Sequence, residues 1–183
     1  MKLRTPQGAT IGEVFSFLSG LYFRGKMAYS TRFANPPPGV EGQLVITTNR
    51  GLVPAATYVT VKDLMKMGAV DIDADERRYR APLVRSVREL AAQIADDCDV
   101  VLLGSVATGK YVDVLAKHLG QRLCFPSDFV GRGDMSRGGL MLRCADEGRE
   151  LTYVPVAGAV RRGQRPPKLE RRTRISADAP PML

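Results

Sequence analysis

Apolar residues recur at helical spacing near the start of the chain. Their spacing of three and four positions predicts a helix over residues 11–34, broken near Gly20 or Gly25. Three prolines at 36–38 end this helix, because proline lacks a backbone donor and fixes φ. The first fifth of the chain is therefore expected to be helical.

A second apolar stripe runs from Leu83 to Ile94, with charged residues on the other faces. It predicts a helix that begins at Pro82, because proline suits the first helical position. The polar stretch before it, residues 70–80, is expected to be a surface loop. The clearest helix of the chain is thus expected to start at the proline.

Two shorter helices are indicated by their ends. Thr60 is a suitable N-cap for a helix that has Asp63 in its first turn. A further helix is predicted from Thr108 to Leu119, and Gly120 ends it. Both follow short apolar runs, as helices of α/β proteins commonly do.

Short apolar runs of strand length occur at residues 43–47, 99–104 and 122–126. The run "DVVLLG" at 99–104 is apolar on both faces, which favours a central parallel strand covered on each side. After Pro126 the pattern changes. Residues 127–139 hold four glycines and little periodicity, so they are expected to form a loop, and residues 140–156 are expected to form a hairpin.

These elements predict an α/β fold. We expect a three-layer sandwich with a mainly parallel central sheet and a C-terminal β-hairpin at its edge. Residues 1–158 would form the single domain, and residues 159–183 a basic, proline-rich, flexible tail.

Composition limits the classes of function. The 183 residues are 44% hydrophobic and 25% charged, and no apolar run approaches the ~18 residues that cross a bilayer. We therefore expect a cytoplasmic protein without a membrane partner. The three cysteines form no C-x-x-C pair and His118 is the only histidine, so neither a metal nor a cofactor is expected.

The net charge of +8 is unevenly spread along the chain. Residues 159–183 contain seven Lys or Arg and two acidic residues, a net charge of +5. Such an arm can bind phosphate backbones without sequence preference, neutralising at most ~7 phosphates with a salt slope of about −6 on duplex. A solubilising or subunit-wrapping arm is the alternative.

The segment "GSVATGK", residues 104–110, lies one residue away from a P-loop. Tyr111 follows the lysine where the Ser or Thr that holds Mg²⁺ is required, so the P-loop mechanism lacks its metal ligand. Two interpretations remain. Ser105 or Thr108 caps a helix, or Ser105, Thr108, Gly109 and Lys110 bind an anion or nucleotide at the helix N-terminus.

The segment "GRGDMSRGG", residues 131–139, is a candidate ligand loop. Arg132 and Arg137 can fork onto phosphate or carboxylate, and Ser136 can contact an anion. Asp134 is the candidate catalytic acid or base, or a ligand for a ribose hydroxyl. The alternative is a structural turn that is braced by Arg–Asp pairs.

Arg50 follows the first predicted strand, at the edge where the segment 104–110 is also expected. We hypothesise that Arg50, Lys110, Arg132 and Arg137 line one electropositive cleft. The alternative is that these cations are solvated on unrelated faces.

Four segments carry a resemblance to a known family. These are "LYFRGKMAYSTRFA", "LVITTNRGLVPA", "VKDL" and "DVVLLGSVATGKYVDVLAKHL", within residues 21–143. Together they resemble uncharacterised bacterial and phage proteins allied to the YaaA peroxide-stress family. The resemblance implies an α/β fold and a connection with nucleotides or nucleic acid, and it implies no particular reaction.

The sequence thus favours a protein that binds nucleotide or nucleic-acid phosphates, with action on a nucleoside or base as a further expectation. If it is an enzyme, a nucleotide- or nucleoside-directed hydrolase or transferase fits, with Asp134 as acid or base. The alternative is a non-enzymatic interaction module whose basic tail docks on RNA or an acidic protein. The oligomeric state is not predicted.

Overall fold

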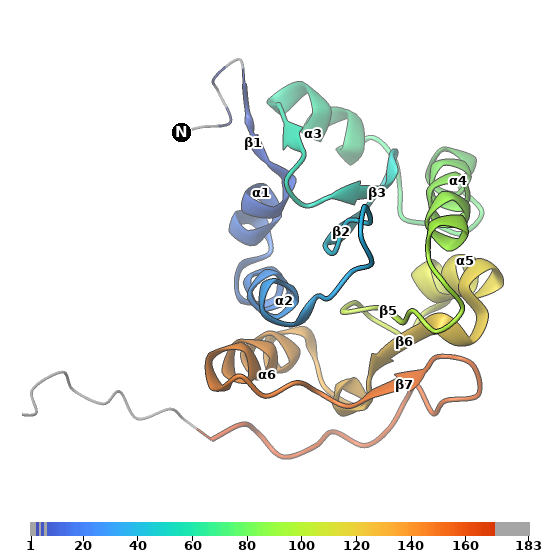
Figure 1. Ribbon diagram of the computed structural model, residues 1–183. Helices are drawn as coiled ribbons and strands as arrows, with labels where there is room; N and C mark the ends of the chain where they lie inside the picture. The colour runs from blue at the N-terminus through green and yellow to red at the C-terminus, as the bar shows by residue number, and fades with distance from the viewer. Residues whose placement is uncertain (1–2, 4, 6, 171–183) are drawn as a thin grey trace, which may run out of the picture.

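The computed structural model describes residues 3, 5 and 7–170. Helices and strands are mixed along the chain (Figure 1). The elements are β1 (Ala9–Thr10), α1 (Ile11–Leu18), α2 (Gly20–Phe33), β2 (Leu44–Thr47), β3 (Gly51–Pro54), β4 (Tyr58–Val59), α3 (Val61–Gly68), α4 (Arg77–Gln93), β5 (Val100–Val101), α5 (Gly109–Leu119), β6 (Leu123–Pro126), α6 (Asp134–Glu147) and β7 (Tyr153–Pro155). Short 3-10 helices at Gly120–Arg122 and Ser127–Phe129 flank β6.

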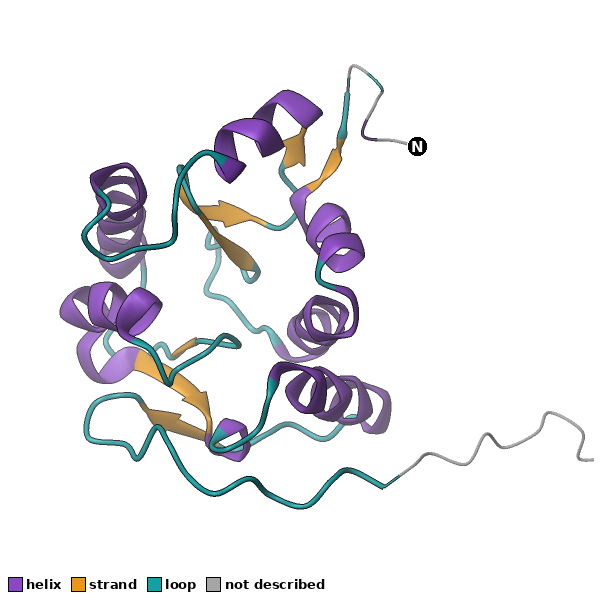
Figure 2. Ribbon diagram, turned by 180° about the vertical axis from the view of Figure 1, so that it is seen from behind, coloured by secondary structure: helices purple, strands orange, loops and turns teal. Residues whose placement is uncertain are grey.

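The strands of the described residues form three small sheets. β1 pairs with β4, β2 and β3 form an antiparallel hairpin, and β5, β6 and β7 form a three-stranded sheet. Within that sheet β5 runs parallel to β6, and β7 runs antiparallel to it. Most strands lie between α1, α2 and α6 on one side and α4 and α5 on the other (Figure 1, Figure 2).

The mixture of helices and strands is that of the α/β class, but the expected mainly parallel central sheet is not seen in the described residues. Of the pairings there, only β5 with β6 is parallel. The run at 99–104 contributes a two-residue edge strand, and β6, buried at all four positions, is the central one. After β5 the chain continues into a loop toward α5, in which the side chains of Leu102 and Val106 are buried.

Local sequence explains where several helices begin and end. Thr60 and Asp63 form a capping box at the start of α3, as Thr10 and Glu13 do at α1. The predicted break in the first helix occurs at Gly20, whose φ of +55° interrupts the helical conformation between α1 and α2. α5 ends at Gly120 as predicted.

The predicted start of the long helix at Pro82 is wrong. α4 begins at Arg77 and contains Pro82 in its interior. The side chain of Glu76 accepts a hydrogen bond from the Arg78 N–H and caps the extra turn, and the fully buried Tyr79 anchors it. The segment expected to be a loop therefore ends in a helix.

The predicted loop at 127–139 and hairpin at 140–156 are also wrong. The helix α6 runs across the boundary between the two segments, and its buried residues Arg137, Leu140, Met141 and Cys144 follow helical spacing. Gly148, within the segment that was expected to be a hairpin, ends the helix in a left-handed conformation with φ +65°. The antiparallel strand β7 follows, but it pairs with β6.

Helices α2 and α6 cross in close contact. A Cβ atom on Gly25 would lie 2.6 Å from the carbonyl oxygen of Gly138, and one on Gly138 would lie 2.7 Å from the Cα of Tyr22. Only glycine at both positions permits this approach. The crossing holds the middle of α2 against the first turns of α6.

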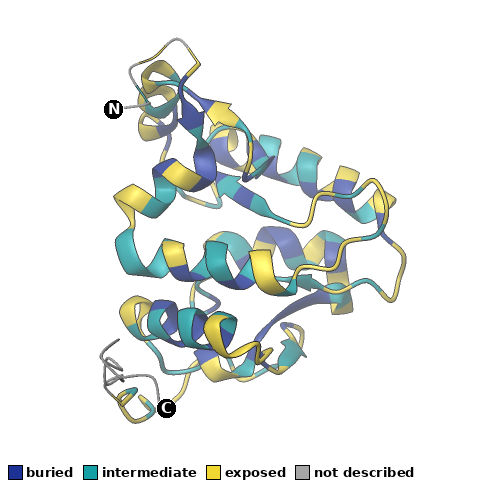
Figure 3. Cartoon of the chain, turned by 60° about the vertical axis from the view of Figure 1, so that its left-hand side comes forward, coloured by how far each residue is buried: buried dark blue, intermediate teal, exposed yellow. Residues whose placement is uncertain are grey.

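The apolar core has two parts. The larger cluster joins α4, α5, β6 and α6 and includes Leu83, Val87, Leu123 and Phe125, and a smaller one lies where α1, β4 and α3 meet. In Figure 3 the helices carry buried residues on their inner faces and exposed ones outside.

The described part of the tail, residues 159–170, contacts the rest of the protein. Arg162 donates two hydrogen bonds to the carbonyl of Ala107, at 3.3 and 3.1 Å, and Leu169 packs against the larger core cluster. Arg143 of α6 donates to the carbonyl of Glu170. The tail cations Arg171, Arg172 and Arg174 lie outside the described residues, and the flexibility of the tail stays a prediction.

Candidate anion-binding site at the start of α6

The segments 104–110 and 131–139, both singled out in the sequence, lie at one edge of the three-stranded sheet. Because β5 and β6 are parallel, the chain leaves both strands at the same edge, toward α5 and α6 respectively. Tyr22 of α2 lies where these segments meet. Its hydroxyl donates to the carbonyl of Leu103 at 3.2 Å, and its pKa, raised chiefly by burial, also responds to Arg137, Asp134 and Tyr111.

Arg137 is a buried, fully engaged side chain. It is 6% exposed, and its Nε and Nη2 donate to the carbonyl of Phe129 at 3.3 and 3.1 Å. Its Nη1 lies 3.6 Å from Oδ1 of Asp134, and its guanidinium lies 5.5 Å from the centroid of the Phe129 ring. For residues 131–139 the sequence left open a ligand loop or a structural turn braced by Arg–Asp pairs. The contacts of Arg137 are of the second kind, and they hold the start of α6 in place.

Lys26 lies one helical turn after Tyr22. Its Nζ is 4.0 Å from the centroid of the Tyr22 ring and 5.5 Å from that of Phe23. Burial lowers the pKa of Lys26 to about 8, with Asp134 opposing and Arg137 reinforcing the shift. No described residue forms a hydrogen bond or ion pair with this amine, so it is held by aromatic faces alone.

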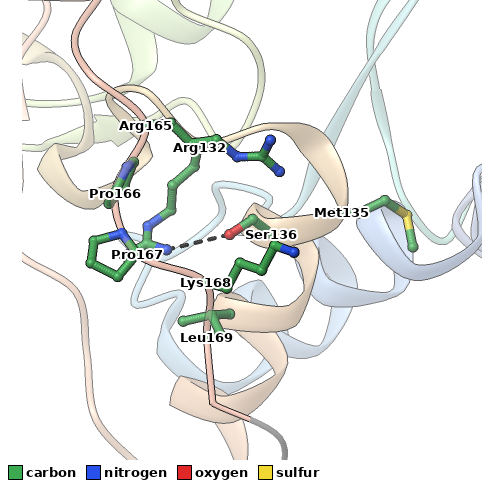
Figure 4. A pocket seen from close by; sticks show the side chains of 8 residues that line it. All are labelled: Arg132, Met135, Ser136, Arg165, Pro166, Pro167, Lys168 and Leu169. Carbon is green, nitrogen blue, oxygen red and sulfur yellow. Dashed lines mark hydrogen bonds between the residues drawn. The ribbon is translucent and has the colours of Figure 1, made fainter.

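A small cavity of about 250 Å³ lies on the other side of the first turn of α6, against the tail (Figure 4). Arg132 is fixed there, because its Nε donates to the carbonyl of Asp128 at 2.9 Å and its Nη1 to Ser136 Oγ at 3.3 Å. Arg165 and Lys168 line the opposite wall, and no carboxylate is among the lining residues. The cavity therefore has an electropositive lining.

The first turns of α5 and α6 lack the side-chain caps that α1, α3 and α4 have. Neither Thr108 before α5 nor Gly133 before α6 makes a side-chain capping bond. The capping role that the sequence offered for Thr108 is thus not seen. In the part of the chain that the structure describes, neither turn has a side-chain cap, and the positive ends of both helices favour a nearby anion.

The other predicted site residues are distributed as follows. Arg50 is paired with Asp63 at the start of α3. Lys110 is exposed, and its carbonyl accepts a hydrogen bond from Tyr79 at 3.1 Å. Ser105 is half-buried in the loop before α5, and Gly109 opens α5 next to the carboxylate of Asp113. Neither Arg50 nor Lys110 is among the residues that line the cavity beside the first turn of α6, and the cleft of four cations stays a prediction.

Sequence reasoning missed four residues of this site: Tyr22, Lys26, Arg165 and Lys168. The first two flank Gly25, and a glycine between two polar-tipped side chains on a helix is a weak signal of close packing. The last two belong to a segment that was expected to be flexible. No pattern in the sequence indicates that this segment forms a wall of the cavity.

Comparisons with protein-family models, with curated proteins and with solved structures found no match. The likeness to the YaaA family thus stays a prediction. Across residues 3, 5 and 7–170, no helix combines the length and apolar character that a bilayer crossing requires. In the same part of the chain, no three His, Cys, Asp or Glu side chains gather as a metal site would.

Proposed function

We propose that the protein binds phosphate groups of a nucleotide or nucleic acid at the start of α6. The observation that carries this proposal is the cavity that Arg132, Arg165 and Lys168 line without a carboxylate. Cations that line one small cavity repel one another, and an anion bound among them relieves that repulsion. Arginine is well suited to phosphate, because its planar fork can donate two parallel hydrogen bonds.

The size of the cavity favours a phosphate group over a whole nucleotide. Pockets that enclose small ligands usually measure about 300–1,000 Å³, and this one measures about 250 Å³. No aromatic side chain lines it, so there is no surface on which a base could stack. The base and sugar of the ligand would therefore lie outside, as they do for a phosphate within a polymer.

Acid–base chemistry on a bound nucleoside is a second candidate. Asp134 is exposed at the first turn of α6, and its charge acts on the half-buried amine of Lys26. An amine with a pKa of about 8 exchanges protons readily near neutral pH. Asp134 and Lys26 would then be the two groups that exchange protons with the substrate. A cytoplasmic location is proposed with it, on the three unpaired cysteines.

Isothermal titration with inorganic phosphate, AMP and a short single-stranded oligonucleotide tests the main proposal. We expect Arg132→Ala and Lys168→Ala to weaken binding about tenfold each, because each removes one charge-assisted contact. Arg24→Ala is the matched control, because Arg24 is exposed on α2 and lines neither cavity. If no phosphate compound binds the wild-type protein, the proposal is wrong.

A truncation after Glu170 separates the cavity from the end of the tail. It retains Arg165 and Lys168 but removes the cations Arg171, Arg172 and Arg174. Binding that survives this truncation and is lost in Arg132→Ala supports the cavity. Binding that is lost on truncation and unchanged in Arg132→Ala supports the interaction module with a basic arm.

A further inference from the structure

A second and larger groove lies between α4 and α5, which pack side by side (Figure 1). Its volume is about 860 Å³. The lining includes five Lys or Arg side chains and the only histidine of the chain: Arg77, Arg80, Arg85, Arg88, Lys117 and His118. The proposed phosphate cavity at α6 shares no residue with it.

The five Lys and Arg side chains of this groove have no partners among the described residues. Three carboxylates, those of Asp75, Glu89 and Asp113, also line the groove. In the described part of the chain, however, none of the five cationic side chains forms an ion pair or hydrogen bond with them or with any other residue. All five are exposed. Their charge is therefore available to an external anion.

The spacing of the cations suits an extended polyanion. Arg77, Arg80 and Arg88 lie on one face of α4, because their separations of three and eleven residues are close to whole helical turns. Eleven residues of helix span about 16 Å, and duplex DNA carries one charge per about 1.7 Å of its axis. Several consecutive phosphates of one nucleic acid would thus lie within reach.

The groove lacks what a protein partner would require. Protein interfaces usually have a core of aromatic or large apolar side chains. The large exposed hydrophobic residues in the described ranges, such as Phe17 and Met65, all lie outside the groove. The apolar lining consists of small and medium-sized side chains, those of Ala74, Ala81, Val84 and Val114.

We infer that the groove between α4 and α5 binds the phosphate backbone of a nucleic acid. The arginines of α4 and Lys117 of α5 would contact successive phosphates, without sequence preference and with strong dependence on salt. This groove is a different surface from the α6 cavity, and the inference is tested by the NMR signals and pKa of His118, which lines the groove. Either proposal can therefore fail alone.

His118 makes a direct test possible. Burial lowers its pKa, as do the nearby charges of Arg88 and Lys117. The other charged groups of the groove are Asp75, Arg77, Arg80, Arg85, Glu89 and Asp113. A bound phosphate would add negative charge beside the imidazole and raise its pKa.

NMR of the wild-type protein can measure this pKa with and without oligonucleotide. The chain has one histidine, so its imidazole signals are unambiguous. We expect short DNA and RNA strands to shift these signals and to raise the midpoint of the His118 titration. No binding, or binding that leaves His118 unmoved, overturns the inference. A shift with polyglutamate but not with oligonucleotide overturns it in favour of an acidic protein.

A pair of double variants gives the second measurement. Arg80→Ala with Arg88→Ala should raise the Kd for oligonucleotide roughly ten- to hundredfold at low salt, because each lost phosphate contact releases about one counterion fewer. Arg24→Ala with Lys62→Ala removes the same charge from exposed sites outside both cavities. Equal losses in the two double variants would show a general charge effect and overturn the inference. The NMR titration needs no variant and decides the matter even if a variant fails to fold.

Discussion

Gly25 of α2 and Gly138 of α6 are in backbone contact where the two helices cross. The approach brings the side chains on either side of Gly25, those of Tyr22 and Lys26, against the start of α6, where Arg137 braces the turn. The candidate site at α6 therefore depends on two residues that have no side chain.

The contact predicts a large effect of Gly138→Ala. The added Cβ would lie 2.7 Å from the Cα of Tyr22 and 2.8 Å from the Leu21 carbonyl oxygen. Backbone atoms at such distances cannot move aside cheaply, so we expect a loss of about 1–3 kcal/mol in the free energy of unfolding. Urea denaturation measures it.

Gly139→Ala is the matched control in the same helix. Its added Cβ would meet only Leu169 Cδ1, at an ordinary 3.5 Å. Alanine is favoured over glycine inside a helix by about 1 kcal/mol, so this variant should be as stable as the wild type or more stable. If both variants lose the same stability, the close crossing of α2 and α6 is not the cause.

The same glycines show why part of the fold could not be predicted from sequence. Four glycines within residues 127–139, together with two arginines, are typical of a ligand loop, and local rules alone favour that interpretation. Glycine is also required where two helix backbones touch, and only the position of α2 distinguishes the two cases. Tertiary packing overrides the poor helix propensity of Gly138 and Gly139.

Where the signal is local, sequence sufficed. The cap at Thr60 and the end of α5 at Gly120 each depend on a few neighbouring residues, and both were predicted. The site needed more. Arg132 lies just before α6 and Ser136 lies in its first turn, but Arg165 and Lys168 line the cavity from a segment without regular structure. No local pattern in the sequence specifies that residues 165–168 pack against the start of α6.

The caps of α3 and α5 give a second prediction. Thr60 accepts a hydrogen bond from the N–H of Asp63, whereas Thr108 caps nothing with its side chain. Thr60→Ala should therefore cost about 1 kcal/mol of stability, and Thr108→Ala clearly less. Thermal unfolding of the two variants side by side measures the difference, and equal losses would contradict the contrast between the two helix starts.

Tyr29 gives a third prediction. Its hydroxyl, in a residue that is 1% exposed, accepts a hydrogen bond from the Leu151 N–H at 2.8 Å and lies 2.8 Å from the Tyr153 hydroxyl. Tyr29→Phe leaves the N–H of Leu151 without its acceptor in a buried place, so we expect a loss of about 1–3 kcal/mol.

The control for Tyr29→Phe is Tyr58→Phe, which removes a hydroxyl from a residue that is 55% exposed. It should leave the midpoint of urea unfolding nearly unchanged. A Tyr29→Phe variant as stable as this control would mean that the link between α2 and the segment before β7 contributes nothing measurable.

The charge on Lys26 gives a prediction about pH. Burial lowers the pKa of Lys26 from 10.5 to about 8, which means that its loss of hydration outweighs its contacts with Tyr22 and Phe23. Below pH 8 both the folded and the unfolded chain carry this proton, and the folded chain bears the full cost of the charge. Between the two pKa values the unfolded chain binds more protons, so stability rises with pH across that window.

Lys26→Met should therefore stabilise the protein at pH 7 by about 1–2 kcal/mol, a figure reduced from the full shift because the side chain is partly exposed. The advantage over the wild type should shrink as the pH rises from 8 to beyond 10.5. Urea denaturation at several pH values measures it, with Lys62→Met on the exposed face of α3 as the control. An advantage that stays constant with pH would show that Met improves packing alone, and that the amine of Lys26 is not held in an environment that disfavours its charge.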